Sequence, residues 1–301
     1  MGVAAIIAAL LLEQWRPLAD RRAVFAALAA WADWLERTFN AGQARHGAIA
    51  WLIAVLLPVA AAGLAYAALY WMSPFAALLA NVAALYFTLG FRQFSHTFTG
   101  IQQAVREGDI DRARELLGSW RGESAVHRSR EEVIRLAIEE GIAASQRHVF
   151  AVLFWFVLLP GPTGAILYRL AAFLQRRWGG KGDFGRLASQ VLYVLEWPAA
   201  RLTAAAFAVV GDFEDAVYCW RTQAAAWHDP NLGIVLAAGA GAMGVKLGMP
   251  LTEVEGLQPR PELGLGEAAD APSLDSAVGL LWRALVLWVL ILMVLGLATV
   301  F

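Results

Sequence analysis

The chain has 301 residues, of which 59% are hydrophobic and 16% are charged, and its mean hydropathy is +0.54. This composition is more apolar than that of a soluble domain of this size and is typical of an integral membrane protein. The net charge of -1 excludes a globally basic nucleic-acid-binding protein, because phosphate binding needs an excess of Lys and Arg on one face.

The first predicted element is a short hydrophobic helix near the N-terminus, within the stretch MGVAAIIAALLLEQWRP. The stretch lacks a basic n-region and an Ala-x-Ala cleavage site, which argues against a signal peptide. Its roughly ten apolar residues are too few to span a bilayer, so we expect a retained helix at the interface or packed against other spans.

Two longer apolar runs follow at residues 48–72 and 74–90. Each is near the roughly 20 residues that a bilayer core requires, and only Ser73 and Pro74 separate them, so the sequence predicts a transmembrane hairpin. The arginines in the segments flanking the hairpin place its two outer ends in the cytoplasm.

Residues 91–148 are predicted to form a cytoplasmic helical segment. Two helical pieces meet at Gly108, with Asp109 as the N-cap of the second, and a third helix begins with the capping-box pattern Ser129 to Glu132. We expect most of the charges in this layer to be solvated.

The apolar pattern resumes at 149–174, where two runs of about eleven residues are joined by PGPTG. Each run is half a bilayer crossing, so the segment is either a re-entrant, broken helical hairpin or a single kinked span. Two further pieces, 198–211 and 232–248, are predicted as short apolar helices that pack inside the protein.

The last two segments differ sharply in composition. Residues 249–277 are rich in Asp, Glu and Pro, with Arg260 as the single cation, and are predicted to form an acidic loop with little regular structure. Residues 278–301 are predicted to form a C-terminal transmembrane helix. The expected fold is therefore an all-α, polytopic membrane protein: a single membrane domain, 1–301, with a cytoplasmic helical layer and broken or short helices.

Several segments resemble a known family. The stretches EGDIDRARELL (107–117), RLAIEEGIA (135–143), PAARLTA (198–204) and DPNLGIVLAAGAGAMGVKLGMP (229–250) are similar to segments of the CobD/CbiB family. This family includes adenosylcobinamide-phosphate synthase and a divergent relative, AmpE, a membrane protein associated with beta-lactamase regulation. The resemblance covers most of the chain and implies a multi-pass protein of the bacterial inner membrane.

The chain departs from the synthase at the family's polar motifs. SWRGES (119–124) stands where the synthase has Gly-Arg-Asp-Thr, and AASQRH (143–148) stands where it has Glu-Asn-Thr-x-Asp-Gly. Joining an aminopropanol phosphate to a corrinoid carboxylate needs carboxylates that hold Mg²⁺ and polar groups that position phosphates. These replacements favour a non-catalytic, site-degenerate scaffold with an accessory, sensing or regulatory role like that suggested for AmpE, with no cofactor and no assigned catalytic residue.

Four polar residues are the candidate ligand-binding positions: Glu139, Arg169, Arg201 and Lys246. Together they would line a pocket for an anionic small molecule or lipid, since charges inside apolar segments indicate function. Structural roles without ligand binding stay open for three of them: Arg169 and Lys246 could snorkel to the membrane interface, and Glu139 could be a solvated helix charge. Arg201, in the first turn of its expected helix, opposes the helix dipole and therefore favours a specific partner.

Two other functions stay open. An Mg²⁺-dependent adenosylcobinamide-phosphate synthase, an amide ligase, predicts that Glu139, Arg169 and nearby carboxylates converge on one cavity. A transporter is disfavoured, because the sequence has no inverted repeat and few charges in its apolar segments. The single cysteine, Cys219, and the spacing of the five histidines predict no metal site, and we interpret Cys219 as a small buried apolar residue. The expected partners are membrane lipid, the anionic ligand and a second copy of the chain, and no nucleic acid.

Overall fold

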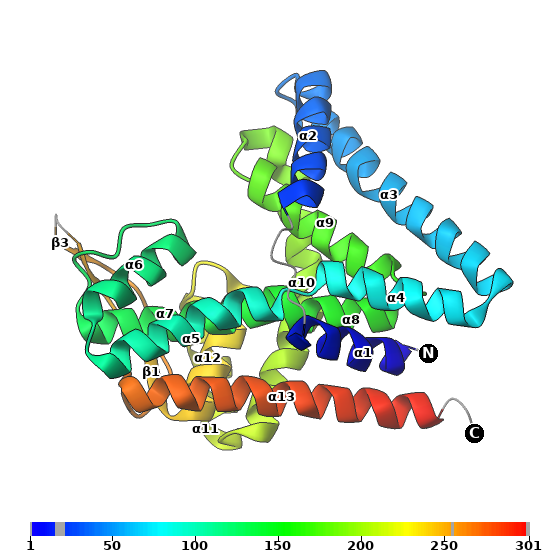
Figure 1. Cartoon of the computed structure of the whole chain (residues 1–301). Helices are drawn as coiled ribbons and strands as arrows, with labels where there is room; N and C mark the ends of the chain where they lie inside the picture. Colours follow the sequence, from blue (N-terminus) through cyan, green and yellow to red (C-terminus); the bar gives the residue numbers. More distant parts are fainter. Residues whose placement is uncertain (1, 16–21, 254–255, 299–301) are drawn as a thin grey trace. The chain divides into compact units, whose positions relative to one another are not determined.

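The computed structural model describes residues 2–15, 22–253 and 256–298, and shows an all-α protein with a few short strands (Figure 1). The chain divides into two compact units. The first holds residues 1–90 and 151–197, and the second holds residues 91–150 and 198–301. Of the three boundaries, the one at 90/91 lies between two helices, whereas those at 150/151 and 197/198 fall inside continuous helical runs. Each unit is therefore built from two separate parts of the sequence.

The first unit is entirely helical in its described residues. Helix α1 packs against α4, and α3 packs against both α4 and α9. Arg177 donates from Nε and Nη2 to Asp33 Oδ1 at 2.8 and 2.5 Å, and this guanidinium holds the pKa of the Asp33 carboxyl below its ordinary value. The elements are α1 (Gly2–Trp15), α2 (Arg22–Phe39), α3 (Ala44–Met72), α4 (Pro74–Thr88), α8 (Ala151–Leu158), α9 (Thr163–Trp178) and the first part of α10 (Gly182–Val210).

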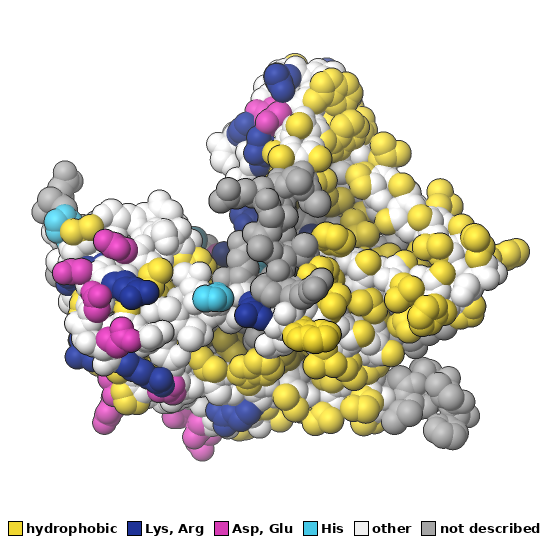
Figure 2. Space-filling view, in the orientation of Figure 1, with side chains coloured by type: hydrophobic (Ala, Val, Ile, Leu, Met, Phe, Trp, Pro, Cys, Tyr) yellow, Lys and Arg dark blue, Asp and Glu magenta, His cyan; other side chains and the backbone are white. Residues whose placement is uncertain are grey.

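Much of the surface of α3 and α4 is apolar (Figure 2). In the most apolar window of α3 only 22% is buried within the protein, and Leu64 and Trp71 are 74% and 91% exposed. Helix α3 is long and apolar enough to cross a membrane, whereas α4, at 15 residues, is about 22 Å long and shorter than a bilayer core. Ser73 separates the two helices, and its Oγ accepts the Ala76 N–H. The hairpin's place in a membrane stays a prediction.

The expected boundary at residues 148 and 149, between the cytoplasmic helical segment and the first apolar half-helix, lies inside one continuous helical run. Helix α7 (Arg130–Ser145) begins with the predicted capping box, in which Ser129 and Glu132 exchange hydrogen bonds. It continues through a π-helical turn, η1 (Gln146–Phe150), directly into α8, because no proline or glycine interrupts the sequence there. Residues 130–158 form one candidate membrane span. The break comes at Pro160 and Gly161, after which α9 packs back on α8.

Helix α10 corrects a second expectation. The piece at 198–211 is not a separate short helix, because α10 runs unbroken from Gly182 to Val210 and carries Pro198 in its interior. A proline removes one hydrogen bond and bends a helix, but it does not have to end one. Arg201 therefore lies well inside a helix and not in its first turn.

In the second unit α7 is the central helix, and α5, α6, α12 and α13 all pack against it. Most of its side chains are buried, and these include the charged Glu132, Arg135 and Glu139. The elements are α5 (Phe91–Glu107), α6 (Ile110–Arg121), α7, η1, the remainder of α10, α11 (Phe213–Thr222), η2 (Ala224–Ala226), α12 (Pro230–Met243), β1 (Val245–Gly248), β2 (Leu251–Glu253), β3 (Gly256–Gln258), β4 (Glu262–Leu263), β5 (Glu267–Ala268) and α13 (Ala271–Ala298).

The expected acidic loop at 249–277 instead contains four short strands and the first turns of α13. Likewise, the expected helix at 232–248 ends at Met243, where Gly244 adopts a left-handed conformation, and β1 follows it. Strand β1 lies between β4, antiparallel, and β5, parallel, while β2 and β3 form a hairpin. Backbone pairing joins these strands, and buried apolar side chains such as Leu247, Leu251 and Leu263 anchor them to the core. Helix α13 begins at Ala271, before the expected start at Val278, and provides the third candidate span, 271–295.

Cys219 on α11 is fully buried, as expected for a small apolar residue. Burial raises the pKa of its thiol to about 11. At pH 8 the folded protein therefore has about 0.1% thiolate at this position, against about a quarter for an unperturbed cysteine. We predict that iodoacetamide leaves Cys219 unmodified in the folded protein and alkylates it after denaturation, measured by intact mass. Rapid alkylation of the folded chain would contradict this burial.

Helices α11 and α12 approach closely because Gly241 has no side chain. A Cβ at this position would lie 2.5 Å from the Asp215 carbonyl oxygen and 2.9 Å from Ala216 Cα. We predict that Gly241→Ala destabilises the protein by about 1–3 kcal/mol, because backbone atoms must move apart. The matched control is Gly279→Ala in α13, which meets nothing within 4 Å and should be neutral or stabilising by up to about 1 kcal/mol. Thermal unfolding in detergent measures both, and equal effects would refute the close approach.

Candidate functional site

Four buried polar side chains form a row on one face of the central helix of the second unit. Glu132, Arg135, Glu139 and Gln146 are 6%, 3%, 4% and 3% exposed. At about 100° per residue, they fall within a sector of about 60°. We call this set the α7 polar row. Charged side chains are rarely buried without partners, so the groups that face this row decide what it can do.

An extended segment, residues 248–252, lies along the α7 polar row and supplies three of those partners. Glu139 Oε1 accepts the Gly248 N–H at 2.9 Å, Arg135 Nη2 donates to the Pro250 carbonyl at 3.1 Å, and Glu132 Oε1 accepts the Thr252 N–H at 2.7 Å. Every second residue of the segment thus meets the next turn of α7. The three contacts follow α7 toward its N-terminus in steps of four and three residues, each about one helical turn, and the left-handed Gly248 and Met249 form the turn at which this register begins.

Gly248 is the residue that starts this register. Its φ is +73°, and a Cβ there would lie 1.9 Å from the Pro261 carbonyl oxygen. The next residue, Met249, also has a positive φ of 60° and donates its N–H to Pro261 at 3.1 Å. Only glycine combines the left-handed conformation with so close an approach, so position 248 fixes the turn that carries the chain onto α7.

Arg260 is the second cation of the site. Its Nη2 donates to Glu139 Oε2 at 2.5 Å, and its guanidinium carbon lies 4.8 Å from the centre of the Trp227 ring. The side chains of Arg260 and Glu139 are 14% and 5% exposed. Arg135 interacts electrostatically with both of them. Arg135 also interacts electrostatically with Glu132, so two guanidinium groups and two buried carboxylates lie along this face of α7.

The four sequence-predicted residues are not gathered into one described cluster. Glu139 is buried and paired, so it is not a solvated helix charge, and neither Gly248 nor Arg260 was among its expected partners. Lys246 lies on β1 and pairs with Glu262 at 2.9 Å, with both side chains partly exposed. Arg201 Nη1 donates to Asn231 Oδ1 at 3.3 Å. Arg169 lies on α9 in the first unit. Their roles in ligand binding stay predictions.

The sequence reasoning missed Arg135, Arg260 and Gln146. Arg135 precedes Glu139 by four residues, and the helical wheel places Gln146 in the same sector, so a search for polar residues at helical spacing could have found both. Arg260 had one signal, its position as the single cation of the acidic segment. Its pairing with Glu139 joins residues 121 positions apart and has no local signature.

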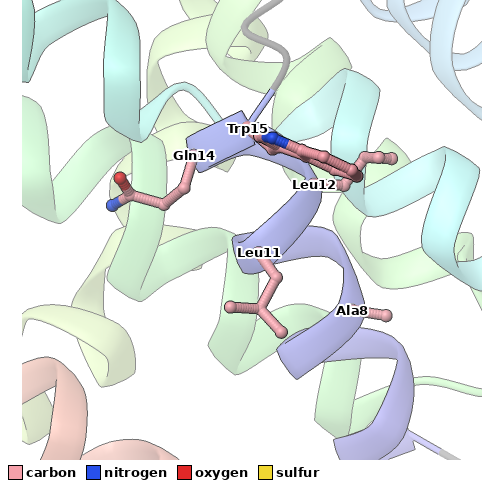
Figure 3. A pocket seen from close by; sticks show the side chains of 5 residues that line it. All are labelled: Ala8, Leu11, Leu12, Gln14 and Trp15. Atoms are coloured by element: carbon pink, nitrogen blue, oxygen red, sulfur yellow. The ribbon is translucent and has the colours of Figure 1, made fainter.

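The carboxylates of this site do not fit a magnesium ion. Each oxygen of Glu132 and Glu139 accepts a hydrogen bond from the protein, and in the described ranges no three His, Cys, Asp or Glu side chains gather where they could hold a metal. No catalytic step is therefore derived through a metal. Away from this cluster, an open hollow on α1 is lined by Ala8, Leu11, Leu12, Gln14 and Trp15, and it offers no titratable group (Figure 3).

We predict that Glu139→Ala destabilises the protein by about 3–5 kcal/mol, because it leaves the largely buried Arg260 guanidinium without its carboxylate. The Gly248 amide also loses its acceptor and should exchange faster in hydrogen–deuterium exchange by mass spectrometry. Glu140→Ala is the matched control, since Glu140 is the adjacent and less buried carboxylate on the same helix. Unchanged exchange in the peptide containing Gly248 would argue against the observed register.

Similarity to known proteins extends over most of the chain. The family model described as CobD/Cbib protein matches residues 3–281. A protein from Stutzerimonas stutzeri, named cobalamin biosynthesis protein CobD, is 35% identical over 296 residues and 96% of each chain. Proteins of the same name from Chromobacterium violaceum and Mycobacterium tuberculosis are 37% and 30% identical, over 71% and 78% of this chain and 70% and 78% of their own lengths. No solved structure matches.

These matches correct the functional hypothesis drawn from the missing motifs. A non-catalytic, accessory scaffold was expected, yet relatives similar over nearly the full length carry the name of a biosynthetic protein. Nothing in the matches supports a degenerate site or a particular likeness to AmpE. With a family match that covers most of its residues, the chain belongs to the CobD/CbiB protein family.

Proposed function

We propose that this protein is an enzyme of cobalamin biosynthesis, a ligase that forms an amide between an aminopropanol phosphate and a carboxylate of a corrinoid. The observation that carries the proposal is the match to a relative named for this pathway over 96% of both chains. A match of that extent includes both units, and therefore includes the buried polar cluster around Glu139.

The charge of that cluster suits the reaction. Both substrates carry anionic oxygens, one on a phosphate and one on a carboxylate, and the cluster offers two guanidinium groups, that of the buried Arg135 and that of the largely buried Arg260. Guanidinium groups bind such oxygens through charge-assisted hydrogen bonds, which strengthen where water is excluded. Glu139 holds Arg260 in position through Oε2 and fixes the Gly248 backbone through Oε1.

The chemistry also explains why positioning matters most. The amine nitrogen forms a bond to the carboxyl carbon, and one carboxyl oxygen leaves as part of a phosphate after a nucleoside triphosphate has activated the acid. The amine proton passes to a base. Holding both partners in place and keeping water from the activated acid are the tasks left to the protein, and rigid buried cations perform them well.

We further propose that the protein is a multi-pass protein of the bacterial inner membrane. Three helices are long and apolar enough to span, and the exposed apolar surface of the first unit is suited to lipid. The α7 polar row begins at the N-terminal end of the span at 130–158, where polar substrates could reach it from the membrane surface.

Complementation tests the function. We expect this chain to restore growth that depends on corrinoid amidation in a bacterium lacking its own cobinamide-phosphate synthase. Arg260→Ala should abolish the rescue, because Glu139 loses its buried partner and the substrates lose a cation. Glu140→Ala should rescue as well as the unaltered chain. A protein that is folded in the membrane but fails to restore growth would refute the ligase assignment.

A further inference from the structure

The cluster around Glu139 contains hydrogen-bond donors that have no acceptor. Arg135 Nε, Arg260 Nη1 and Trp227 Nε1 are all buried and without a hydrogen-bond partner among the described residues. Arg135 and Trp227 are only 3% and 7% exposed. An unsatisfied buried donor is destabilising, and one that carries charge is more so. Because these three unsatisfied donors belong to one cluster, we look for a single acceptor group that would satisfy all of them.

The three donors belong to side chains that are in contact or in electrostatic range of one another. Arg260 is the centre, because it stacks over the Trp227 ring at 4.8 Å and interacts with Arg135. Each arginine is fixed through an atom other than its unsatisfied one. Arg135 donates from Nη2 to the Pro250 carbonyl, and Arg260 donates from Nη2 to Glu139. The remaining N–H groups are therefore held in place and available.

The missing partner has to be rich in acceptors and negatively charged. Every unsatisfied atom in this group of three is a donor, and two of the three belong to guanidinium groups, which are always positively charged. Glu139 cannot serve all three donors, because its oxygens already accept from Gly248 and Arg260. A carboxylate ligand offers two oxygens, whereas a phosphate monoester offers three, one for each donor.

We propose that Arg135, Arg260 and Trp227 form a binding site for the phosphate group of a phosphate monoester. The proposal deepens the proposed function and rests on it for the identity of the bound molecule, which in a ligase would be the amine substrate. Arg260, with its side chain 14% exposed, is the point of entry, and Arg135 is the deeper anchor. Glu139 is a positioning residue that orients Arg260.

The test is direct binding to the purified full chain in detergent, without corrinoid or nucleotide. Isothermal titration with inorganic phosphate and with phosphoethanolamine should show saturable binding at one site, and acetate should bind at least about tenfold more weakly. Binding by neither phosphate compound, or equal binding by acetate, would overturn the proposal. The assay needs no turnover, so a failure of complementation and a failure of binding are separate results.

Conservative variants locate the site. Arg135→Lys and Arg260→Lys keep the charge but lose the guanidinium donors, and each should weaken phosphate binding by about tenfold or more. Trp227→Phe keeps the ring under Arg260 and removes only the indole N–H, so it should cost about threefold or more. Arg106→Gln is the control for general electrostatics, because the Arg106 side chain is 57% exposed and pairs with Asp275, and it should change affinity by less than about threefold. Folded variants with unaltered affinity would place the phosphate elsewhere and refute the site.

A lipid headgroup could supply the same phosphate chemistry. Titrations of protein in nanodiscs of phosphatidylcholine alone and with phosphatidylglycerol distinguish the two sources. If the site takes a soluble monoester, phosphoethanolamine binds equally well in both. If phosphatidylglycerol competes and the arginine variants abolish that competition, the bilayer is the source and the oxyanion site still stands. Competition that survives in both arginine variants would contradict it.

Discussion

The arrangement of the second unit depends on the pairing between the α7 polar row and the backbone of residues 248–252. Two carboxylates and a guanidinium are buried on the central helix, and their desolvation is tolerable only if each finds a partner of matching chemistry. Extended backbone supplies such partners at regular intervals, alternately a donor and an acceptor. The segment after α12 is therefore ordered by α7, and its polar, proline-rich composition is no obstacle, because its main chain makes the contacts.

That pairing also determines where the remaining groups lie. Gly244 ends α12 and Gly248 turns the chain onto α7, so the following hairpin and Arg260 are brought back to Glu139. Arg260 then lies between the carboxylate and the Trp227 ring, which is contributed by the segment before α12. Three parts of the sequence that are far apart thus meet at one buried carboxylate, and a change in the register would displace all of them.

Local signals predicted the elements better than the site. The capping box at Ser129 and the N-cap at Asp109 depend on residues close together in the sequence, and the structure confirms both. The strands, of two to four residues each, are too short to show a side-chain pattern. Pro198 led to the wrong start for α10, because a proline inside a helix usually ends it. The partners of Glu139 are set by long-range packing. Function was misjudged because a few absent motifs were weighed above similarity along the whole chain.

The buried cluster is better explained by binding than by stability. A buried ion pair contributes little net stability over apolar residues of the same volume, and donors left without acceptors make the balance worse. Such an arrangement lowers the free energy of the protein only when an anion completes it. The donors of Arg135 and Arg260 are each fixed by a second contact, so little conformational entropy is lost when the anion enters. Preorganised, desolvated cations of this kind favour a ligand whose charge matches them, and the rigidity of the donors makes the proposed site selective.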